Sequence, residues 1–467
     1  MMNKILSTYR GGYAVVLLYM LQQCEYSFGA FAKWGHRASN LRFRAIAKRQ
    51  KLKWTMKVKI LFGLMIFSAV LILPLTLVFW PVAWPMILGF WNAVFMVLQK
   101  PIEIFIVLRA TRKLQDFKGI KIAVLGSYGK TTAKEVLATV FGSFDGVAIA
   151  TLGNKNTLLG NAKFIEKVVS SSARIAIFEL GEFKFGDIRK MAKMIRPDYA
   201  IMTGVSGAHL DTLGDLSGVV RTLDEVREFV PSSKIAVNAD NEILRDVSAE
   251  WRFSVSGVSS DLDDFGISDV EVLVDGTRFK FMGLAVFSPL LGEHNVAIVA
   301  MAIYWASSIL DLGDAEILEN LARLRVFEHR MEPRKLTNGA LVIDDTYNGN
   351  LEGVRAGLRL LGELDLAADG TRFVRKSYAT PGLVEQGALS DEIHEEMGEL
   401  IAAADVDNVY LMRNSTTSAI SRGLQKGEFA GRLTILENPL DFYENLDKVT
   451  VAGDVILMQN DWTDNYE

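Results

Sequence analysis

The sequence predicts an α/β protein in which an N-terminal transmembrane helical hairpin precedes two α/β domains. Three observations predict this fold class. Residues 60–80 and 82–98 are uncharged and mostly apolar. From about Gly119, short β-branched runs alternate with helical patterns, which is typical of parallel sheets covered by helices. A glycine-rich segment, GSYGKTT, joins a strand pattern to a helix pattern at residues 126–132.

The apolar segments predict the hairpin because a bilayer span needs about 20 apolar residues. We assign residues 1–56 to a basic interfacial segment and residues 57–110 to the hairpin, with a tight turn at Trp80–Pro85 because the prolines there disfavour continuous helix. Lysine and arginine flank the hairpin on both sides, so both ends are expected in the cytoplasm. A buried core hairpin is the alternative.

The rest of the chain is expected to form two domains. Residues 111–326 are predicted to be a central nucleotide-binding domain, and residues 327–467 a Rossmann-like C-terminal domain that begins after the helical pattern NVAIVAMAIYWASSIL and before the strand pattern LVIDD. The formal charge of −4 argues against general nucleic-acid binding. Cys24 is the single cysteine, so an intramolecular disulfide is impossible.

The GSYGKTT segment has the residues of a shortened phosphate-binding loop, G-x-x-G-K-T-T. Glycines at 126 and 129 allow the backbone to approach phosphate groups closely. Lys130 is expected to reach the β- and γ-phosphates, and the Thr131 hydroxyl to bind Mg²⁺. The predicted nucleotide-binding residues of the loop are Gly126, Ser127, Tyr128, Gly129, Lys130, Thr131 and Thr132.

A carboxylate follows the next buried strand pattern. Glu179 comes directly after IAIF, at the carboxyl end of a strand, which is where ligands bind in open α/β sheets. Carboxylate oxygen is a preferred Mg²⁺ ligand. Glu179 is therefore predicted to bind metal, whereas His209 in SGAHL is by itself as compatible with a structural role.

Further motifs occur in a fixed order at residues 151–162, 178–188, 203–215, 291–302 and 328–350. They read TLGNKNTLLGNA, FELGEFKFGDI, TGVSGAHLDTLGD, LGEHNVAIVAMA and EHRMEPRKLTNGALVIDDTYNGN. From about Lys118 onward, the chain resembles the Mur ligase family of ATP-dependent amide-bond-forming enzymes. Within the family, the likeness is most marked to the ligases that add D-alanyl-D-alanine to a UDP-N-acetylmuramoyl tripeptide.

The resemblance implies an ATP-dependent ligase that activates a carboxylate as an acyl phosphate. The catalytic residues that it implies are Lys130, Glu179, His209 and Arg330. The metal ligands that it implies are Thr131, Glu179 and His209. Further ATP contacts are implied for Asn156, Asn295, Arg330 and Asp345, with Tyr347 and Asn348 in the same motif. The implied partners are ATP, Mg²⁺, a muramoyl-peptide acceptor, and an amino acid or D-alanyl-D-alanine.

Three features depart from the family pattern. Leu223 stands where members usually carry a carbamylated lysine, so either Asp224 or Glu225 substitutes for it or the second metal site is weak. Ile298 replaces a second asparagine beside the adenine. The hairpin occupies the place of the usual UDP-binding domain.

The hairpin leads to a predicted location at the bacterial inner membrane, with the catalytic domains in the cytoplasm. Either the anchor guides the enzyme to a lipid-linked acceptor, or it only localises an enzyme that uses soluble precursors. Two other functions remain open. One is a poly-γ-glutamate synthase-like ligase, and the other is a degenerate ATP-binding membrane scaffold.

Overall fold

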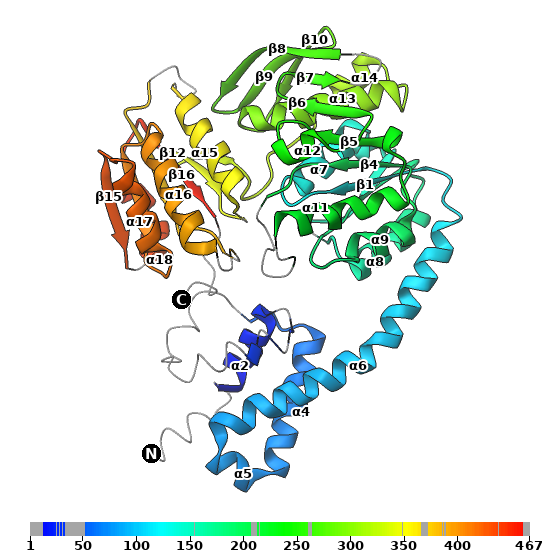
Figure 1. The fold of residues 1–467 in the computed structure, drawn as a ribbon, viewed down its shortest axis with the longest axis vertical. Helices are drawn as coiled ribbons and strands as arrows, with labels where there is room; N and C mark the ends of the chain where they lie inside the picture. Colours follow the sequence, from blue (N-terminus) through cyan, green and yellow to red (C-terminus); the bar gives the residue numbers. More distant parts are fainter. Residues whose placement is uncertain are drawn as a thin grey trace. The chain divides into compact units, whose positions relative to one another are not determined.

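The structure is a computed structural model of the 467-residue chain (Figure 1). It describes residues 13–24, 26–27, 29, 31–32, 52–153, 155–206, 213, 215–259, 264–347, 349–365, 372–384, 386, 389–437 and 439–460. By its internal contacts the chain divides near Phe105 into an N-terminal unit and a larger second unit.

The described N-terminal residues are mostly helical, in α2 (Tyr13–Gln23), α4 (Met56–Leu71), α5 (Leu73–Val78) and α6 (Trp80–Leu114). Helix α4 begins at the Thr55 cap, whose side chain accepts a hydrogen bond from the Val58 N–H at 3.3 Å. The chain leaves the helix at Ile72, and α5 has only six residues. Helix α6 instead continues through Pro85 and Pro101 for 35 residues.

The predicted transmembrane hairpin is wrong. In the part of the chain that the structure describes, no helix is both long enough and apolar enough to cross a membrane. Helix α4 has 16 residues and is therefore about 24 Å long, short of the roughly 30 Å of a bilayer core. The helical run is interrupted at Ile72, inside the first apolar segment, and again at Phe79, whereas the residues of the predicted turn lie within α6. The predicted membrane location and the predicted lipid-linked acceptor both depended on this hairpin and lose their support with it.

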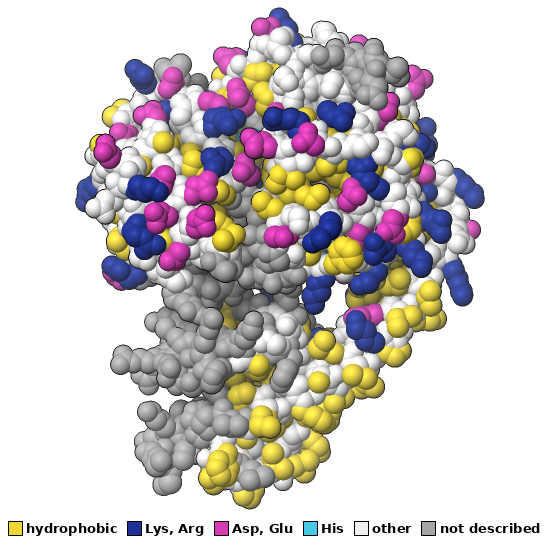
Figure 2. Space-filling model, viewed as in Figure 1, with side chains coloured by type: hydrophobic (Ala, Val, Ile, Leu, Met, Phe, Trp, Pro, Cys, Tyr) yellow, Lys and Arg dark blue, Asp and Glu magenta, His cyan; other side chains and the backbone are white. Residues whose placement is uncertain are grey.

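Apolar side chains nevertheless lie exposed along α6, and Figure 2 shows them as a yellow band in its lower part. They include Val97, Ile102, Phe105 and Leu108, each more than half exposed. Toward the end of the helix, Ala110 and Leu114, which are one turn apart, are instead buried in the core of the second unit.

The second unit contains a sheet of ten described strands in the order β10-β9-β8-β7-β6-β5-β4-β1-β3-β2. Strands β1 to β6 pair in parallel, whereas β6 to β10 pair antiparallel, so the sheet is mixed and not purely parallel as predicted. The strands are β1 (Ile120–Leu125), β2 (Ala148–Ala150), β3 (Ile175–Glu179), β4 (Tyr199–Met202), β5 (Ile235–Asn238), β6 (Trp251–Ser254), β7 (Gly257–Ser259), β8 (Asp264–Leu273), β9 (Gly276–Phe281) and β10 (Leu284–Ser288).

Helices cover both faces of this sheet. Successive side chains of β1 point to opposite sides, and the apolar ones on each side are buried under helices. Ile122 and Val124 pack with α7, α13 and α14 in one core. Ala123 and Leu125 pack with α8, α9, α11 and the end of α6 in another. The helices are α7 (Lys130–Val140), η3 (Ser143–Asp145), α8 (Leu158–Val169), α9 (Asp187–Ile195), α11 (Leu216–Asp224), η4 (Glu225–Glu228), η5 (Ser232–Lys234), α12 (Glu242–Arg245), η6 (Glu293–Asn295), α13 (Val296–Ser308) and α14 (Asp314–Leu321).

The C-terminal part of the chain forms a second sheet, in the order β11-β12-β16-β13-β14-β15. All of its pairs are parallel except β11 with β12. Its strands are β11 (Glu332–Lys335), β12 (Leu341–Asp345), β13 (Arg375–Thr380), β14 (Asn408–Met412), β15 (Arg432–Leu436) and β16 (Asp454–Gln459). Its helices are α15 (Leu351–Glu363), α16 (Ser390–Ala403), α17 (Thr417–Lys426), α18 (Pro439–Glu444) and α19 (Leu446–Val449). The predicted boundary at residues 326–327 lies between α14 and β11.

Candidate active site

The glycine-rich loop lies at the carboxyl edge of the ten-stranded sheet, between β1 and α7. Gly126 has φ +139°, and a Cβ there would lie 2.5 Å from Thr203 Oγ1. Gly129 has φ +74° and forms the N-cap of α7. The Ser127 N–H donates to the Gly204 carbonyl at 2.7 Å, and the Ser127 hydroxyl is buried without a hydrogen-bond partner among the described residues. The loop therefore brings the N-terminal N–H groups of α7 to an anion-binding position.

Tyr128 holds the loop against the neighbouring strand. Its hydroxyl accepts a hydrogen bond from Asn241 Nδ2 at 3.2 Å, and its backbone carbonyl accepts one from the Thr203 hydroxyl. A Cβ on Gly204 would lie 2.2 Å from the ring, so the ring packs directly on that backbone. Burial raises the pKa of Tyr128 to about 12, which keeps the phenol protonated. Thr132 lies in the first turn of α7 and is half-buried.

The Lys130 ammonium folds back over the loop. It donates to the Gly126 carbonyl and to both carboxylate oxygens of Glu182, at 3.0 and 3.1 Å. The Lys130 side chain is 11% exposed and that of Glu182 only 1%, so the pair is nearly excluded from water. Sequence analysis did not identify Glu182, although it lies three residues after Glu179 in the same motif.

Glu179 is the centre of a second cluster, as the end of β3 reaches the first turn of α7. Its carboxylate accepts hydrogen bonds from the Thr131 hydroxyl at 3.1 Å and from Asn156 Nδ2 at 3.2 Å. Lys134 Nζ lies 3.2 Å from Glu179 Oε2, and both side chains are at most 1% exposed. The structure thus brings together three predicted residues and one that was missed, Lys134, which follows Lys130 by one helical turn.

The predicted second metal site receives less support. His209 lies outside the described residues, and Leu223 is buried in the hydrophobic core between the sheet and α11. Asp224 forms an ion pair with Arg227. The Glu225 carboxylate caps α9, because it accepts the N–H groups of Gly186 at 2.7 Å and of Arg189 at 2.9 Å. Both acidic side chains already have partners, which argues against either replacing the family lysine.

Asn295 lies at the start of α13, where the predicted adenine contact falls. Its side-chain amide donates to the Leu291 carbonyl at 2.7 Å and so stabilises its own turn. Ile298, the residue that departs from the family pattern, is 7% exposed and belongs to the hydrophobic core. Its apolar side chain helps to attach α13 to the sheet.

In the C-terminal domain, Asp345 closes the turn that carries Arg330. The Asp345 carboxylate accepts hydrogen bonds from Gln459 Nε2 at 2.8 Å and from the Met331 N–H at 3.3 Å. Burial raises the pKa of Asp345 to about 7, and the charge of Arg330 opposes this rise. The Arg330 guanidinium lies 4.5 Å from the centre of the Tyr347 ring. Asn348 lies outside the described residues.

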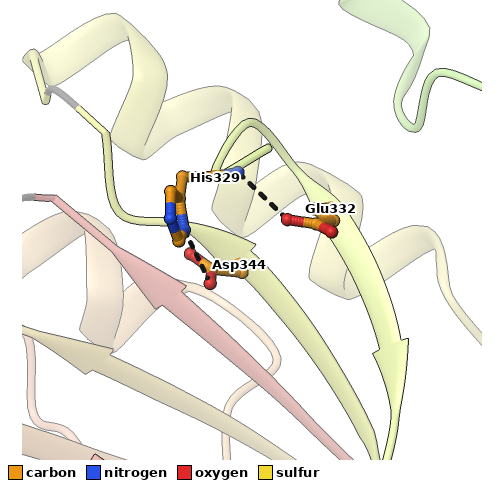
Figure 3. Close-up of side chains that lie close together, drawn as sticks. All are labelled: His329, Glu332 and Asp344. Atoms are coloured by element: carbon orange, nitrogen blue, oxygen red, sulfur yellow. Dashed lines mark hydrogen bonds and ion pairs between the residues drawn. The ribbon is translucent and has the colours of Figure 1, made fainter. Parts of the chain in front are cut away.

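The neighbouring Asp344 holds the same turn from its other side, as Figure 3 shows. His329 Nδ1 lies 3.0 Å from Asp344 Oδ2, and the His329 N–H donates to Glu332 at 3.1 Å. These three residues are the group among the described ones whose donor atoms lie close enough to share a metal ion. Asp344 also accepts from the Thr346 hydroxyl at 2.7 Å and lies 3.5 Å from Arg334, so its oxygens are already paired. The cluster is therefore a structural clamp on the turn.

A phosphate-binding loop, a buried lysine and a strand-end carboxylate at the carboxyl edge of an α/β sheet define a nucleotide-dependent P-loop enzyme. The model of the Mur ligase middle domain matches residues 124–306. The UDP-N-acetylmuramoyl-tripeptide–D-alanyl-D-alanine ligase of Escherichia coli K12 is 30% identical over 327 residues, which cover 68% of this chain and 69% of that enzyme. The chain therefore belongs to the Mur ligase family and is an ATP-dependent ligase, as its motifs predicted.

Other relatives and solved structures are similar to this chain over comparable lengths. The enzyme of the same name from Bacillus subtilis is 25% identical and aligns over 74% of each chain. Among solved structures, MurF from Acinetobacter baumannii has a TM-score of 0.64 at 22% identity and 77% coverage of both chains. MurF ligase from Thermotoga maritima in complex with ADP has a TM-score of 0.63 at 22% identity, covering 77% of this chain and 80% of that one. At these identities the structures show the shared fold.

Proposed function

We propose that this chain uses ATP to join D-alanyl-D-alanine to the peptide of a UDP-N-acetylmuramoyl tripeptide. The observation that carries the proposal is the contact between Thr131 and Glu179 beside the phosphate loop. It places two oxygen ligands for the metal that a phosphoryl transfer needs next to the loop that would bind the phosphates. The substrates are those in the names of the relatives from Escherichia coli and Bacillus subtilis.

The residues around Glu179 fit Mg²⁺. The Thr131 hydroxyl and the Glu179 carboxylate are oxygen ligands, which Mg²⁺ prefers. Lys134 and Asn156 hold the same carboxylate, and such outer contacts orient a metal ligand. Bound Mg²⁺ would offset the negative charge that develops on the phosphates during transfer.

Other side chains around the proposed nucleotide site would contribute to the remaining steps of the reaction. A carboxylate is a poor electrophile toward an amine, so the γ-phosphoryl group of ATP is first transferred to it, which releases ADP and forms an acyl phosphate. The amine of the dipeptide then attacks the acyl carbon, the amide bond forms, and inorganic phosphate leaves. Lys130 would bind the transferring phosphate and stabilise its charge. Arg330 and Asp345 are proposed to contact the nucleotide from the C-terminal domain. Asn156 and Asn295 are proposed as further nucleotide contacts, and His209 as a metal ligand.

A ligase reaction with defined substrates tests the proposal. Purified protein is incubated with ATP, Mg²⁺, D-alanyl-D-alanine and a UDP-linked muramoyl tripeptide, and the products are identified by mass. We expect the pentapeptide product with the wild type and none with Lys130→Ala. A glutamate-extended product with glutamate as the amine would favour the poly-γ-glutamate synthase-like alternative. ATP binding without any product would favour the scaffold and contradict the proposal.

A further inference from the structure

The P-loop lysine already has a buried anionic partner in this structure. Lys130 Nζ lies 3.0 and 3.1 Å from the two Glu182 oxygens, and the Glu182 side chain is 1% exposed. We propose that Glu182 is a specificity-determining residue, which makes the site accept the magnesium complex of a nucleotide and disfavour the metal-free nucleotide. This inference rests on the proposed nucleotide site.

Local packing holds Glu182 in this position. It lies in the loop between β3 and α9, where the Gly181 N–H donates to the Asn156 carbonyl at 2.8 Å. A Cβ on Gly181 would lie 2.9 Å from Asn156 Cγ, so the absence of a side chain at this residue allows the two loops to approach. The Glu182 carboxylate is therefore buried beside the phosphate loop, where Lys130 is its partner.

The position has an electrostatic consequence. A phosphate bound in the loop must share the Lys130 ammonium with the Glu182 carboxylate. Two anions at one cation repel each other strongly where water is excluded. A divalent cation on the nucleotide lowers its negative charge and so weakens this repulsion. Metal-free nucleotide experiences the whole repulsion. Glu182 therefore lowers the affinity for metal-free nucleotide more than it lowers the affinity for the magnesium complex.

A purely structural role makes a different prediction. If Glu182 only holds Lys130 in place, its removal lowers the affinity for both forms of the nucleotide alike. If the Glu182 charge selects against metal-free nucleotide, removing that charge raises the affinity for the metal-free form most. The isosteric change Glu182→Gln removes the charge, whereas Glu182→Asp keeps it, so the two variants separate the two roles.

The test is the ADP dissociation constant, measured by titration calorimetry with Mg²⁺ and separately with EDTA. We expect the wild type to bind ADP at least about tenfold more tightly with Mg²⁺, a difference of about 1.4 kcal/mol. Glu182→Gln should bind metal-free ADP about tenfold more tightly than the wild type does, while Glu182→Asp keeps the wild-type ratio. Glu135→Gln is the matched control, because Glu135 contacts Lys134 and not Lys130.

Equal affinities of Glu182→Gln and wild type for metal-free ADP would overturn the inference. So would a wild type that binds ADP equally well with and without Mg²⁺, a result that needs no variant to fold. A wild type that binds no ADP at all would instead reject the proposed nucleotide site itself. Thermal unfolding of each variant checks that the fold is retained.

Discussion

The buried ion pair between Lys134 and Glu179 predicts a large loss of stability in Lys134→Met. The change keeps an apolar stem of similar length but removes a cation 3.2 Å from a carboxylate that is 1% exposed. Removing one partner of a buried ion pair costs about 3–5 kcal/mol. Thr131 and Asn156 continue to donate to Glu179, so we expect the lower end, about 3 kcal/mol.

Urea unfolding followed by tryptophan fluorescence measures this loss. Trp251 and Trp305 are suitable probes, because their rings pack edge to face at the core that also contains α7. Glu135→Gln serves as the control. Its partner contact is the same Lys134 nitrogen, but the Glu135 side chain is 35% exposed, so we expect a change below about 1 kcal/mol.

The double variant Lys134→Met/Glu179→Gln distinguishes the ion pair from simple packing. It removes both charges together, so no uncompensated ion remains buried, and we expect at least half of the lost stability to return. Our reasoning is refuted if Lys134→Met loses less than about 1 kcal/mol, or if the double variant loses the sum of the two single changes.

Three further changes have defined outcomes. Gly126→Ala places a Cβ 2.5 Å from Thr203 Oγ1 at φ +139°, so ADP affinity should fall at least about tenfold by calorimetry, while Gly362→Ala, which meets nothing within 4 Å, should leave it unchanged. Glu225→Gln weakens the cap on α9, so the free energy of unfolding should fall by about 1–2 kcal/mol, and an unchanged thermal midpoint would contradict this role. The pKa of Asp345 is raised to about 7, above the unfolded value of about 3.9, so its stabilising contribution is complete below that lower value and declines as the pH rises to 7. Asp345→Asn should flatten this decline in urea midpoints between about pH 4 and pH 8, and identical slopes in both proteins would count against it.

Contiguous features were predictable from the sequence. The phosphate loop depends on a strand, two glycines and a helix start that follow one another within residues 120–140. Glu179 was identifiable because it ends a buried strand, and a parallel sheet brings its strand ends to one edge. The sequence order of such motifs was also sufficient to indicate the family.

Hydropathy alone misled the prediction for the N-terminal unit. It reports the apolar content of a window but not where a helix ends, and α4 ends at Leu71 inside the apolar run. The prolines that predicted a turn lie instead within α6, because Pro81 is its second residue and the helix continues through Pro85. The local pattern therefore indicated helices, whereas their lengths depended on packing.

By itself, the sequence indicated the glycine-rich loop, the α/β class and the family, because each depends either on a short contiguous motif or on the order of such motifs along the chain. Only the tertiary structure decided the partners of the buried charges. Lys134 meets Glu179 across 45 residues and Lys130 meets Glu182 across 52, because α7 packs against the end of β3. A charge on one element finds its partner only after the two elements pack, so no local pattern contains that information.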